Sequence, residues 1–293
     1  MTERLTERLT ALGDYLSNGV LRVLGAVLRL LPYERRLEVG GWIGRRVTLN
    51  LPPARNRVLT NVERVFPDLG FGARMGILRG VGDNFGRVMI EQMMMDDFID
   101  RRDKISVTGP GYAPFMEAVQ EGNGAIFASA HFGQWEAGRI FVRDLGIEIA
   151  AVYRSHNNPY FDADFKASLE AVSPAAFAKG KEGMRGLIRH VRKGGVAAVL
   201  VDQKQTGSPK IPFLGHPAET TTSVAKLAVA TGTLLIPTIS RRLEDGVSFE
   251  VVLGEPVPHG PEEEMMREVN DQLSAWITET PEQWFWYHRR WRF

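Results

Sequence analysis

The sequence has no cysteine among its 293 residues, which excludes disulfide bonds and metal sites built from thiolates. It has no apolar run of about 18 residues, so a conventional membrane-spanning helix is not expected. The P-loop, HExxH and GxSxG motifs are missing, as is a GxGxxG after a strand, and we expect no cofactor and no metal. The net charge of +1 gives no strong attraction to nucleic acid, so no nucleic-acid partner is expected.

The composition favours a folded protein with a substantial core, because 44% of the residues are hydrophobic. A chain of this length suits one large α/β domain with a smaller appended element. Charge is distributed unevenly, since residues 1–60 contain ten arginines and only five acidic residues. Such a basic end suits an anionic membrane surface or a phosphorylated substrate.

Residues 12–31 have the pattern of an amphipathic helix. One polar stripe is formed by Asp14, Asn18, Arg22 and Arg29, and leucine and valine fill most of the remaining circumference. A broad apolar arc beside a narrow cationic face predicts a helix that lies in a membrane interface. Packing against the protein's own domain and a short tilted span are the alternatives. A signal peptide is not expected, because the opening residues are too acidic.

From residue 105 onward the sequence alternates between short apolar runs and amphipathic helical segments. The predicted strands are 104–108, 124–130, 147–153, 196–201, 234–240 and 247–253. Repeated strand–helix units with short connections predict an α/β fold with a mixed, largely parallel central sheet covered by helices. We therefore divide the chain into an N-terminal helical, membrane-associating region at 1–67 and an α/β domain at 68–293.

The segment HFGQWE at 131–136 directly follows the predicted buried strand 124–130. Imidazole can accept a proton near neutral pH, and a nearby carboxylate can fix its tautomer and stabilise the cation that forms. We expect His131 to lie in the loop after the strand and Glu136 in the first turn of the next helix, with the two side chains in contact. This arrangement predicts a catalytic pair, and a structural histidine is the alternative.

Three further predicted strands end in polar pairs of residues: Tyr153-Arg154, Asp202-Gln203 and Arg241-Arg242. Because the carboxyl ends of parallel strands lie along one edge of a sheet, we expect these pairs to converge with His131. Arg154 is expected to clamp an anion. The simpler alternatives are a solvated strand cap for Arg154, a loop cap for Asp202 and surface positions for the last two arginines.

Two segments outside the strands are also candidates for a functional role. The connection at 204–220 is long for a structureless loop, and such loops often form lids or grooves. The tail at 284–291 interleaves aromatic residues with cations. It can fold back onto the domain, lie at a membrane interface or bind single-stranded nucleic acid, and the last of these is the least favoured.

The order of these segments resembles the lysophospholipid-type acyltransferases, in particular the bacterial late acyltransferases of lipid A biosynthesis. HFGQWE matches the H-x4-[D/E] signature of that family, although Gln134 stands where asparagine is usual. The other matching segments are NVERVFP at 61–67, VYR at 152–154 with NNP at 157–159, VDQ at 201–203, PFLG at 212–215 and WFWYHRRWR at 284–292. These segments come in the expected order along most of the chain, which makes the resemblance specific.

The resemblance implies that His131 and Glu136 transfer a fatty acyl chain from an acyl thioester, with acyl carrier protein favoured over CoA as the carrier. The implied acceptor is a hydroxyl of a phosphorylated glycolipid such as a lipid A precursor. The implied location is the cytoplasmic face of the bacterial inner membrane, with peripheral or shallow anchoring to the membrane surface. The expected substrate-binding residues are Tyr153, Arg154, Asp202, Gln203 and Arg241.

Three alternatives to this function stay open. A related branch acylates phosphatidylinositol mannosides from acyl-CoA, so donor and acceptor are less fixed than the reaction. A thioester or lipid hydrolase would use the same two residues to activate water. A noncatalytic lipid-binding protein would bind membranes without turning over a thioester.

Overall fold

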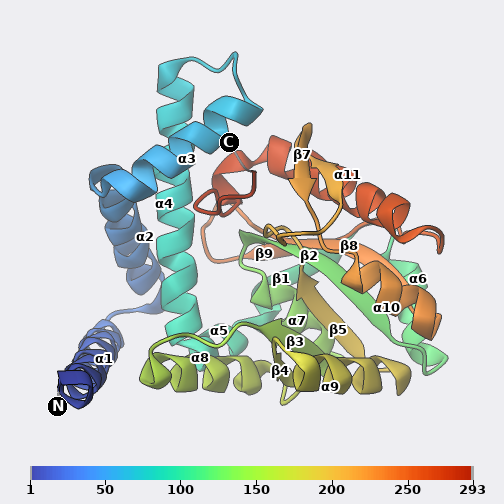
Figure 1. The fold of residues 1–293 in the computed structure, drawn as a ribbon, viewed down its shortest axis with the longest axis horizontal. Coiled ribbons are helices and arrows are strands. Elements are labelled where there is room, and N and C mark those ends of the chain that lie inside the picture. The colour runs from blue at the N-terminus through green and yellow to red at the C-terminus, as the bar shows by residue number, and fades with distance from the viewer. Residues whose placement is uncertain (1, 292–293) are drawn as a thin grey trace.

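The computed structural model describes residues 2–291, with side chains described from residue 11 onward. Arg292, the last residue of the WFWYHRRWR segment, lies outside the described residues. Helices from the first third of the chain stand beside a sheet that the later helices cover (Figure 1). The early helices are α1 (Thr2–Leu28), α2 (Tyr33–Asn50), α3 (Pro52–Val65), α4 (Phe71–Met93) and α5 (Met95–Ile99), followed by a 3-10 turn, η1 (Arg102–Lys104).

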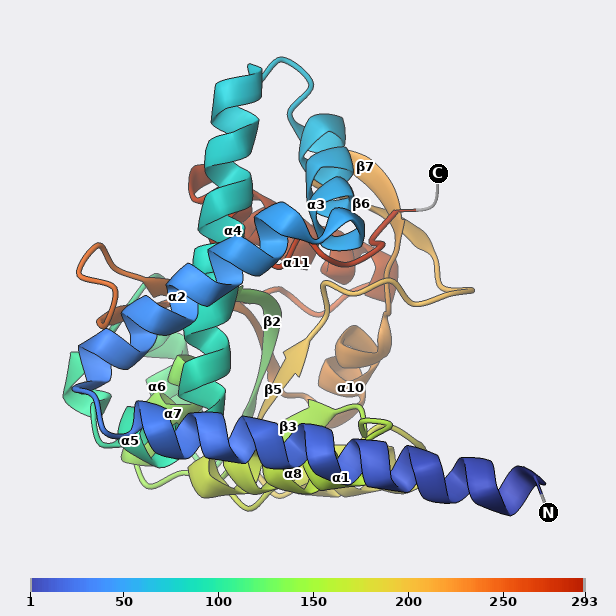
Figure 2. The same cartoon turned by 90° about the vertical axis from the view of Figure 1, so that its left-hand side faces the viewer.

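Glycines bring the backbones of α2 and α4 into direct contact. A Cβ atom added at Gly44 would lie 2.1 Å from the carbonyl oxygen of Gly82, and one added at Gly86 would lie 2.0 Å from that of Gly40. No larger residue fits at these positions, so the close approach of the two helices depends on glycine. The two crossed helices form the frame of the N-terminal part of the molecule (Figure 2).

The central sheet has seven strands in the order β1-β9-β8-β2-β5-β3-β4. Its neighbouring strands run parallel, except that β8 and β9 are antiparallel. This confirms the expected mixed, largely parallel sheet. The strands are β1 (Ile105–Thr108), β2 (Ala125–Gly133), β3 (Ile149–Tyr153), β4 (Ala176–Ala178), β5 (Val196–Leu200), β8 (Leu234–Arg242) and β9 (Phe249–Leu253).

Helices cover both faces of the sheet. Alternate residues of β2 point to opposite faces, so Ile126 joins one core cluster while Phe127 joins the other with Phe115 and Ile140. Burial on both faces explains why β2 begins with a continuous apolar run at 125–128. The covering helices are α6 (Tyr112–Gln120), α7 (Glu136–Asp144), α8 (Pro159–Val172), α9 (Lys181–Arg192), α10 (Ser223–Thr231) and α11 (Glu262–Glu279), with a last 3-10 turn, η2 (Pro281–Gln283).

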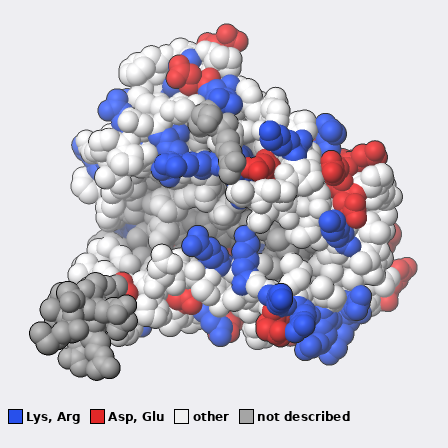
Figure 3. All heavy atoms as spheres, in the orientation of Figure 1, with Lys and Arg blue, Asp and Glu red and all other residues white. Residues whose placement is uncertain are grey.

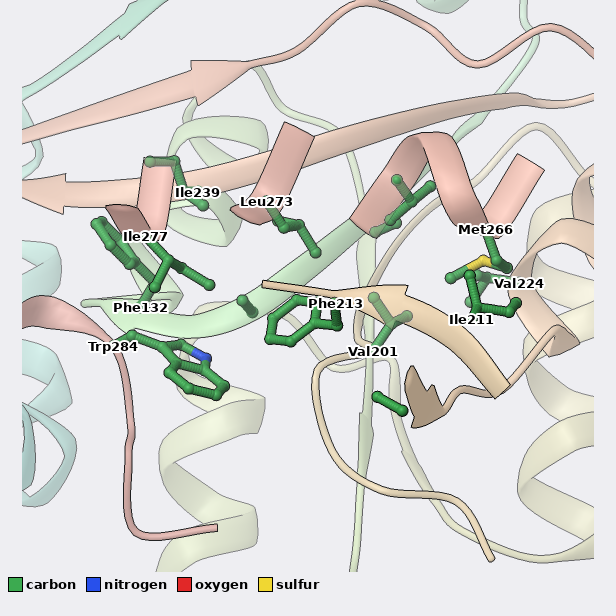
Figure 4. Packing of buried hydrophobic residues seen from close by; sticks show 14 of the residues in the cluster. Phe132, Val201, Ile211, Phe213, Val224, Ile239, Met266, Leu273, Ile277 and Trp284 are labelled. Atoms are coloured by element: carbon green, nitrogen blue, oxygen red, sulfur yellow. The ribbon is translucent and has the colours of Figure 1, made fainter. Parts of the chain in front are cut away.

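The C-terminal tail takes part in one of these cores. Figure 4 shows Leu273 and Ile277 of α11 pointing into the cluster that also holds Phe132 of β2. Trp284 packs into the same cluster, with its ring centroid 5.4 Å from that of Phe213. The tail therefore folds back onto the domain, which was one of its three expected arrangements.

The structure differs from the sequence-based expectation in three places. β2 continues to Gly133, so His131 lies inside a strand and not in a loop. The connection at 204–220 is not structureless, because β6 (Lys210–Phe213) and β7 (His216–Glu219) pair in it as an antiparallel hairpin. The short edge strand β4 was not predicted at all. Within residues 2–291, we find no helix with the length and hydropathy of a membrane span.

Candidate active site

His131 and Asp202 meet because their strands are neighbours. β2 carries His131, and the parallel strand β5 ends at Leu200, two residues before Asp202. The imidazole Nδ1 lies 2.8 Å from Oδ1 of Asp202, and the backbone N–H of His131 donates to Oδ2 at 2.9 Å. The histidine side chain is 16% exposed and the aspartate side chain is fully buried. The pair thus joins a buried carboxylate to a ring that can be reached from outside.

Asp202 is held as a charged acceptor. Its Oδ2 also accepts a hydrogen bond from the indole N–H of Trp284 at 2.8 Å. Burial raises the pKa of this carboxyl, but the charge that His131 can carry and its hydrogen bonds outweigh burial, and the pKa of Asp202 lies well below its usual range. A carboxylate can only accept hydrogen bonds, so the hydrogen between the two side chains sits on Nδ1 of His131. The lone pair of Nε2 is left to act as a base.

Gln203 bridges His131 to a second histidine. Its amide nitrogen lies 3.3 Å from Nε2 of His131 and 2.8 Å from Nε2 of His288. Burial, followed by the charge of His131, lowers the pKa of His288 to about 4, so this ring is neutral near pH 7. An amide has two N–H groups, and Gln203 can donate one to each ring.

The folded-back tail forms one wall of the site. The backbone N–H of Phe285 donates to the carbonyl oxygen of His131 at 2.9 Å. The rings of Phe285 and His288 lie 5.9 and 5.3 Å from the imidazole, and Trp135 meets it edge-on at 5.1 Å. The sequence interpretation assigned no role to Trp284 or His288, although the density of aromatic residues in the tail was a signal for packing against the domain.

Glu136 is not the partner of His131, contrary to the expected contact. Its carboxylate accepts a hydrogen bond from Nη1 of Arg139 at 2.5 Å, and both side chains are buried. The reason is local geometry: α7 begins at Glu136, and Arg139 lies three residues later on the same helical face. The histidine is instead oriented by Asp202, which the sequence interpretation placed among the substrate-binding residues.

One cavity of about 450 Å³ lies beside His131, and both Glu136 and Arg139 line it as well. We call it the catalytic cavity. Phe127, Ala151, Ala198, Val199 and Leu200 give it an apolar part formed by the sheet, and the polar residues His156, Lys179, Gln203 and His288 are also among its lining residues. Its size lies in the range of small-molecule sites. An apolar interior next to a histidine base suits a substrate with a hydrocarbon chain and a reactive polar end.

The other expected site residues divide into two groups. Tyr153 and Arg154 line the catalytic cavity together with Gln203, so the structure brings these three together near His131. Arg241 does not line this cavity, contrary to expectation, because it pairs with Glu250 at 3.4 Å and with Glu279 at 2.7 Å. The antiparallel neighbour β9 supplies the first of these acids and α11 the second.

Comparison with known proteins identifies the chain's family. The profile of a family described as "Bacterial lipid A biosynthesis acyltransferase" matches residues 4–293. The chain belongs to this family. A lipid A biosynthesis acyltransferase of Haemophilus influenzae is 22% identical over 274 residues, covering 89% of this chain and 82% of that protein.

Two relatives from Escherichia coli are similarly distant. A lipid A biosynthesis lauroyltransferase is 24% identical over 270 residues, which are 89% of this chain and 87% of that protein. A lipid A biosynthesis palmitoleoyltransferase is 23% identical over 269 residues, which are 89% and 86% of the two chains. Membership of the lipid A biosynthesis acyltransferase family supports acyl transfer as the reaction of this chain.

Proposed function

We propose that the protein transfers a fatty acyl chain from an acyl carrier protein thioester to a hydroxyl of a phosphorylated glycolipid of the lipid A precursor class. The observation that carries this proposal is the imidazole of His131 at an apolar cavity, with Nδ1 fixed by buried Asp202 and Nε2 left as a base. Family membership supports the acyl transfer. Acyl-CoA as donor and a phosphatidylinositol mannoside as acceptor form the second candidate.

His131 acts as the general base. Its Nε2 removes the proton from the acceptor hydroxyl, and the oxygen attacks the carbonyl carbon of the thioester. The imidazolium that forms is stabilised by the carboxylate of Asp202, at 2.8 Å from Nδ1. When the tetrahedral intermediate collapses, the C–S bond breaks and the leaving thiolate takes the proton back from Nε2. No acyl-enzyme is needed.

Gln203 is assigned as a donor to the oxyanion, because the N–H that meets Nε2 of His131 at 3.3 Å becomes free once Nε2 has taken the proton of the acceptor hydroxyl. The backbone N–H groups at the start of α7 are less suitable. Those of Gln134 and Gly138 donate to the carbonyl oxygen and to Oγ of Ser240, and that of Glu136 donates to the side chain of Gln134. Glu136 has a supporting role, since its buried pair with Arg139 fixes the part of α7 that lines the catalytic cavity.

Cations next to the cavity suit phosphorylated substrates. Arg154 and Lys179 line the catalytic cavity and are exposed at its edge. In Figure 3, lysine and arginine side chains gather at the lower right over α9, whose Arg185, Arg189 and Arg192 are exposed. A planar guanidinium binds phosphate oxygens in pairs, so Arg154 is assigned to an acceptor phosphate.

Helix α1 is the element that would meet the membrane. Its outer face carries exposed apolar side chains at helical spacing: Leu12, Leu16, Val20, Val23 and Val27. These residues are exposed by 54% or more, which is costly in water and favourable in a lipid interface. The exposed face of α1 supports a peripheral or shallow anchoring, and we propose the cytoplasmic face of the inner membrane as the location, where carrier-bound thioesters and lipid acceptors meet.

The decisive test is a substrate panel analysed by mass spectrometry. Purified protein is incubated with acyl carrier protein and CoA thioesters and with candidate phosphorylated glycolipids. We expect an acylated glycolipid, and we expect His131→Ala to lower turnover by about 10²–10⁴ while the protein stays folded. Free fatty acid formed without an acceptor would indicate a hydrolase. Near-normal acyl transfer by a folded His131→Ala protein would contradict the assignment of His131 as the general base.

A further inference from the structure

A second cavity of about 430 Å³ lies between α1, α4 and α8. Figure 2 shows α1 running along the base of the molecule beside α8. Three methionines, Met89, Met93 and Met95, and two aromatic residues, Phe161 and Phe165, line it. Unbranched methionine side chains adapt to irregular apolar ligands. Phe165 also lines the catalytic cavity, so a single side chain is shared by the two cavities.

Charged and polar contacts hold α1 over this second cavity. Asp164 of α8 accepts hydrogen bonds from Arg22 at 2.6 and 2.9 Å and from Asn18 at 2.9 Å. Gly25 of α1 faces Met93, where an added Cβ would still be 3.5 Å from the methionine methyl group. The side of α1 with small and polar residues therefore faces the cavity, while its apolar arc with Val20 and Val23 is exposed.

One buried polar atom of a residue that lines this space has no hydrogen-bond partner among the described residues. Gln92 lines the second cavity, is 8% exposed, and its Oε1 has no hydrogen bond among the described residues. Its amide orientation is fixed from the other side. Ser168 donates its hydroxyl to the carbonyl oxygen of Phe165 at 2.7 Å, so Ser168 must accept the 2.6 Å bond from Nε2 of Gln92. The free group is thus an acceptor, and an O–H or N–H donor would satisfy it.

We propose that the second cavity binds an acyl chain of the lipid acceptor, and that Gln92 recognises a hydroxyl or amide N–H on that chain. The inference rests on the proposed acyl transfer. The donor's single chain is accounted for by the apolar part of the catalytic cavity, whereas the second cavity lies next to the exposed apolar arc of α1. A lipid whose headgroup reaches the catalytic cavity can therefore place a further chain on the other side of Phe165.

The first experiment fills the second cavity. Ala167→Trp enlarges a residue that lines it, and Ala163→Trp makes the same change one turn earlier on α8, at an exposed residue that lines neither cavity. The full chain is assayed on vesicles with an acyl carrier protein thioester and a phosphorylated glucosamine lipid. We expect Ala167→Trp to raise KM for the acceptor at least tenfold, with KM for the thioester and acceptor-independent hydrolysis changed less than twofold. Ala163→Trp should match the unmodified protein, and an unchanged acceptor KM in Ala167→Trp overturns the proposal.

The second experiment tests whether Oε1 of Gln92 recognises a hydroxyl on the acyl chain. Two diazirine-labelled glucosamine phosphate lipids are compared, one with a hydroxyl on its acyl chain and one without. The unmodified protein should be labelled within 89–95 and 161–171 and should prefer the hydroxylated probe by about fivefold to tenfold, the value of one hydrogen bond. Gln92→Leu should abolish this preference. Equal labelling of the unmodified protein by both probes, or labelling of these segments by a phosphatidylethanolamine probe alone, overturns the assignment of Gln92 to an acceptor chain.

These readouts separate the inference from the proposed reaction. If the unmodified protein acylates no glucosamine lipid, the proposed function fails in the first assay, whatever the variants do. If the protein does transfer acyl chains but the acceptor KM of Ala167→Trp stays at the unmodified value, only the inference about the second cavity fails.

Discussion

Asp202 and Glu91 are both fully buried carboxylates, but they lie in different surroundings and have different partners. Asp202 accepts hydrogen bonds from His131 and Trp284 at the catalytic cavity. Glu91 of α4 accepts two bonds from Arg242 of β8, at 2.6 and 2.7 Å, and one from the side chain of Gln134 at 2.9 Å. One carboxylate is paired with an imidazole, which can serve as a base, and the other with a guanidinium, which cannot.

The two pairs differ in role, because the Glu91–Arg242 pair supports the fold and the His131–Asp202 pair offers a group that can react. The guanidinium of Arg242 also bonds to Asn84 at 3.2 Å and lies 4.7 Å from the ring centroid of Phe249, so it is enclosed on several sides. Its pair with Glu91 connects the N-terminal helices to the sheet and leaves no group to react. In the His131–Asp202 pair, Nδ1 is anchored by the carboxylate, and Nε2 meets the amide of Gln203 at 3.3 Å beside the catalytic cavity. A buried carboxylate therefore indicates a reactive site only when its partner is a group that can react.

The largest expected effect comes from removing the charge of Asp202 while keeping its shape. Asp202→Asn no longer forces the hydrogen onto Nδ1 of His131, so the base nitrogen is lost in a large share of molecules. We expect kcat to fall by about 10²–10⁴ with little change in KM for the thioester. Circular dichroism and the melting temperature should show a folded protein. Activity within a factor of three of the unmodified enzyme would contradict the role of Asp202.

The Glu91–Arg242 pair should show the opposite behaviour, with a large effect on stability and little on catalysis. Arg242→Met leaves the carboxylate of Glu91 buried without its cation, and the free energy of unfolding should fall by about 3–5 kcal/mol. Urea unfolding measures the loss, and kcat of the protein that remains folded should change little.

Two controls sharpen this measurement. Arg35→Met breaks the exposed pair with Glu38, at 2.5 Å, and should cost less than about 1 kcal/mol. The double variant Glu91→Leu with Arg242→Met removes both charges and should be more stable than Arg242→Met alone. If the double variant is instead the least stable, the buried charge is not the source of the loss.

A smaller effect is expected from pH. The pKa of His288 is about 4 in the folded protein, against about 6.5 in an unfolded chain. Between these values the unfolded chain binds the proton and the folded protein does not, so stability falls as the pH is lowered from about 6.5 to 4. Asp202 does not contribute in this window. Its pKa is lowered in the folded protein, so the stability that its ionised form adds is lost only when the pH falls below the pKa that this carboxyl has in the unfolded chain.

Melting temperatures recorded at intervals across this pH range test the prediction. His288→Gln removes the titrating ring and should flatten the pH dependence of the melting temperature. His259→Gln, at a histidine that does not line the catalytic cavity, is the matched control. A melting temperature that rises on acidification from pH 6.5 would contradict the assigned burial of His288.

The sequence predicted most of the sheet, because buried strands such as 124–130 are apolar runs bounded by turn residues. It also predicted that His131, Arg154 and Gln203 would gather at one place, and these residues do line one cavity. The order of the strands could not be read from local patterns. Because β5 lies directly beside β2, Asp202 reaches the imidazole, and this neighbour relation joins residues 71 positions apart.

The prediction that Glu136 contacts His131 was wrong for a local reason that is visible in the sequence. Arg139 follows it by three residues, a spacing at which a helix brings opposite charges together. The error at Arg241 has a distant cause, since its partners Glu250 and Glu279 belong to β9 and α11. Gln92 was beyond any prediction, because an unpaired acceptor is recognised only when all its neighbours are known.

The folded-back tail also dictates when the enzyme can begin to work. Trp284 anchors Asp202, and Phe285 and His288 enclose the imidazole, so the site is incomplete until these residues have left the ribosome. A nascent chain that already contains His131 and Asp202 still lacks one wall. Until residues 284–288 have folded back, Asp202 lacks the indole donor and the imidazole lacks two of the rings that surround it.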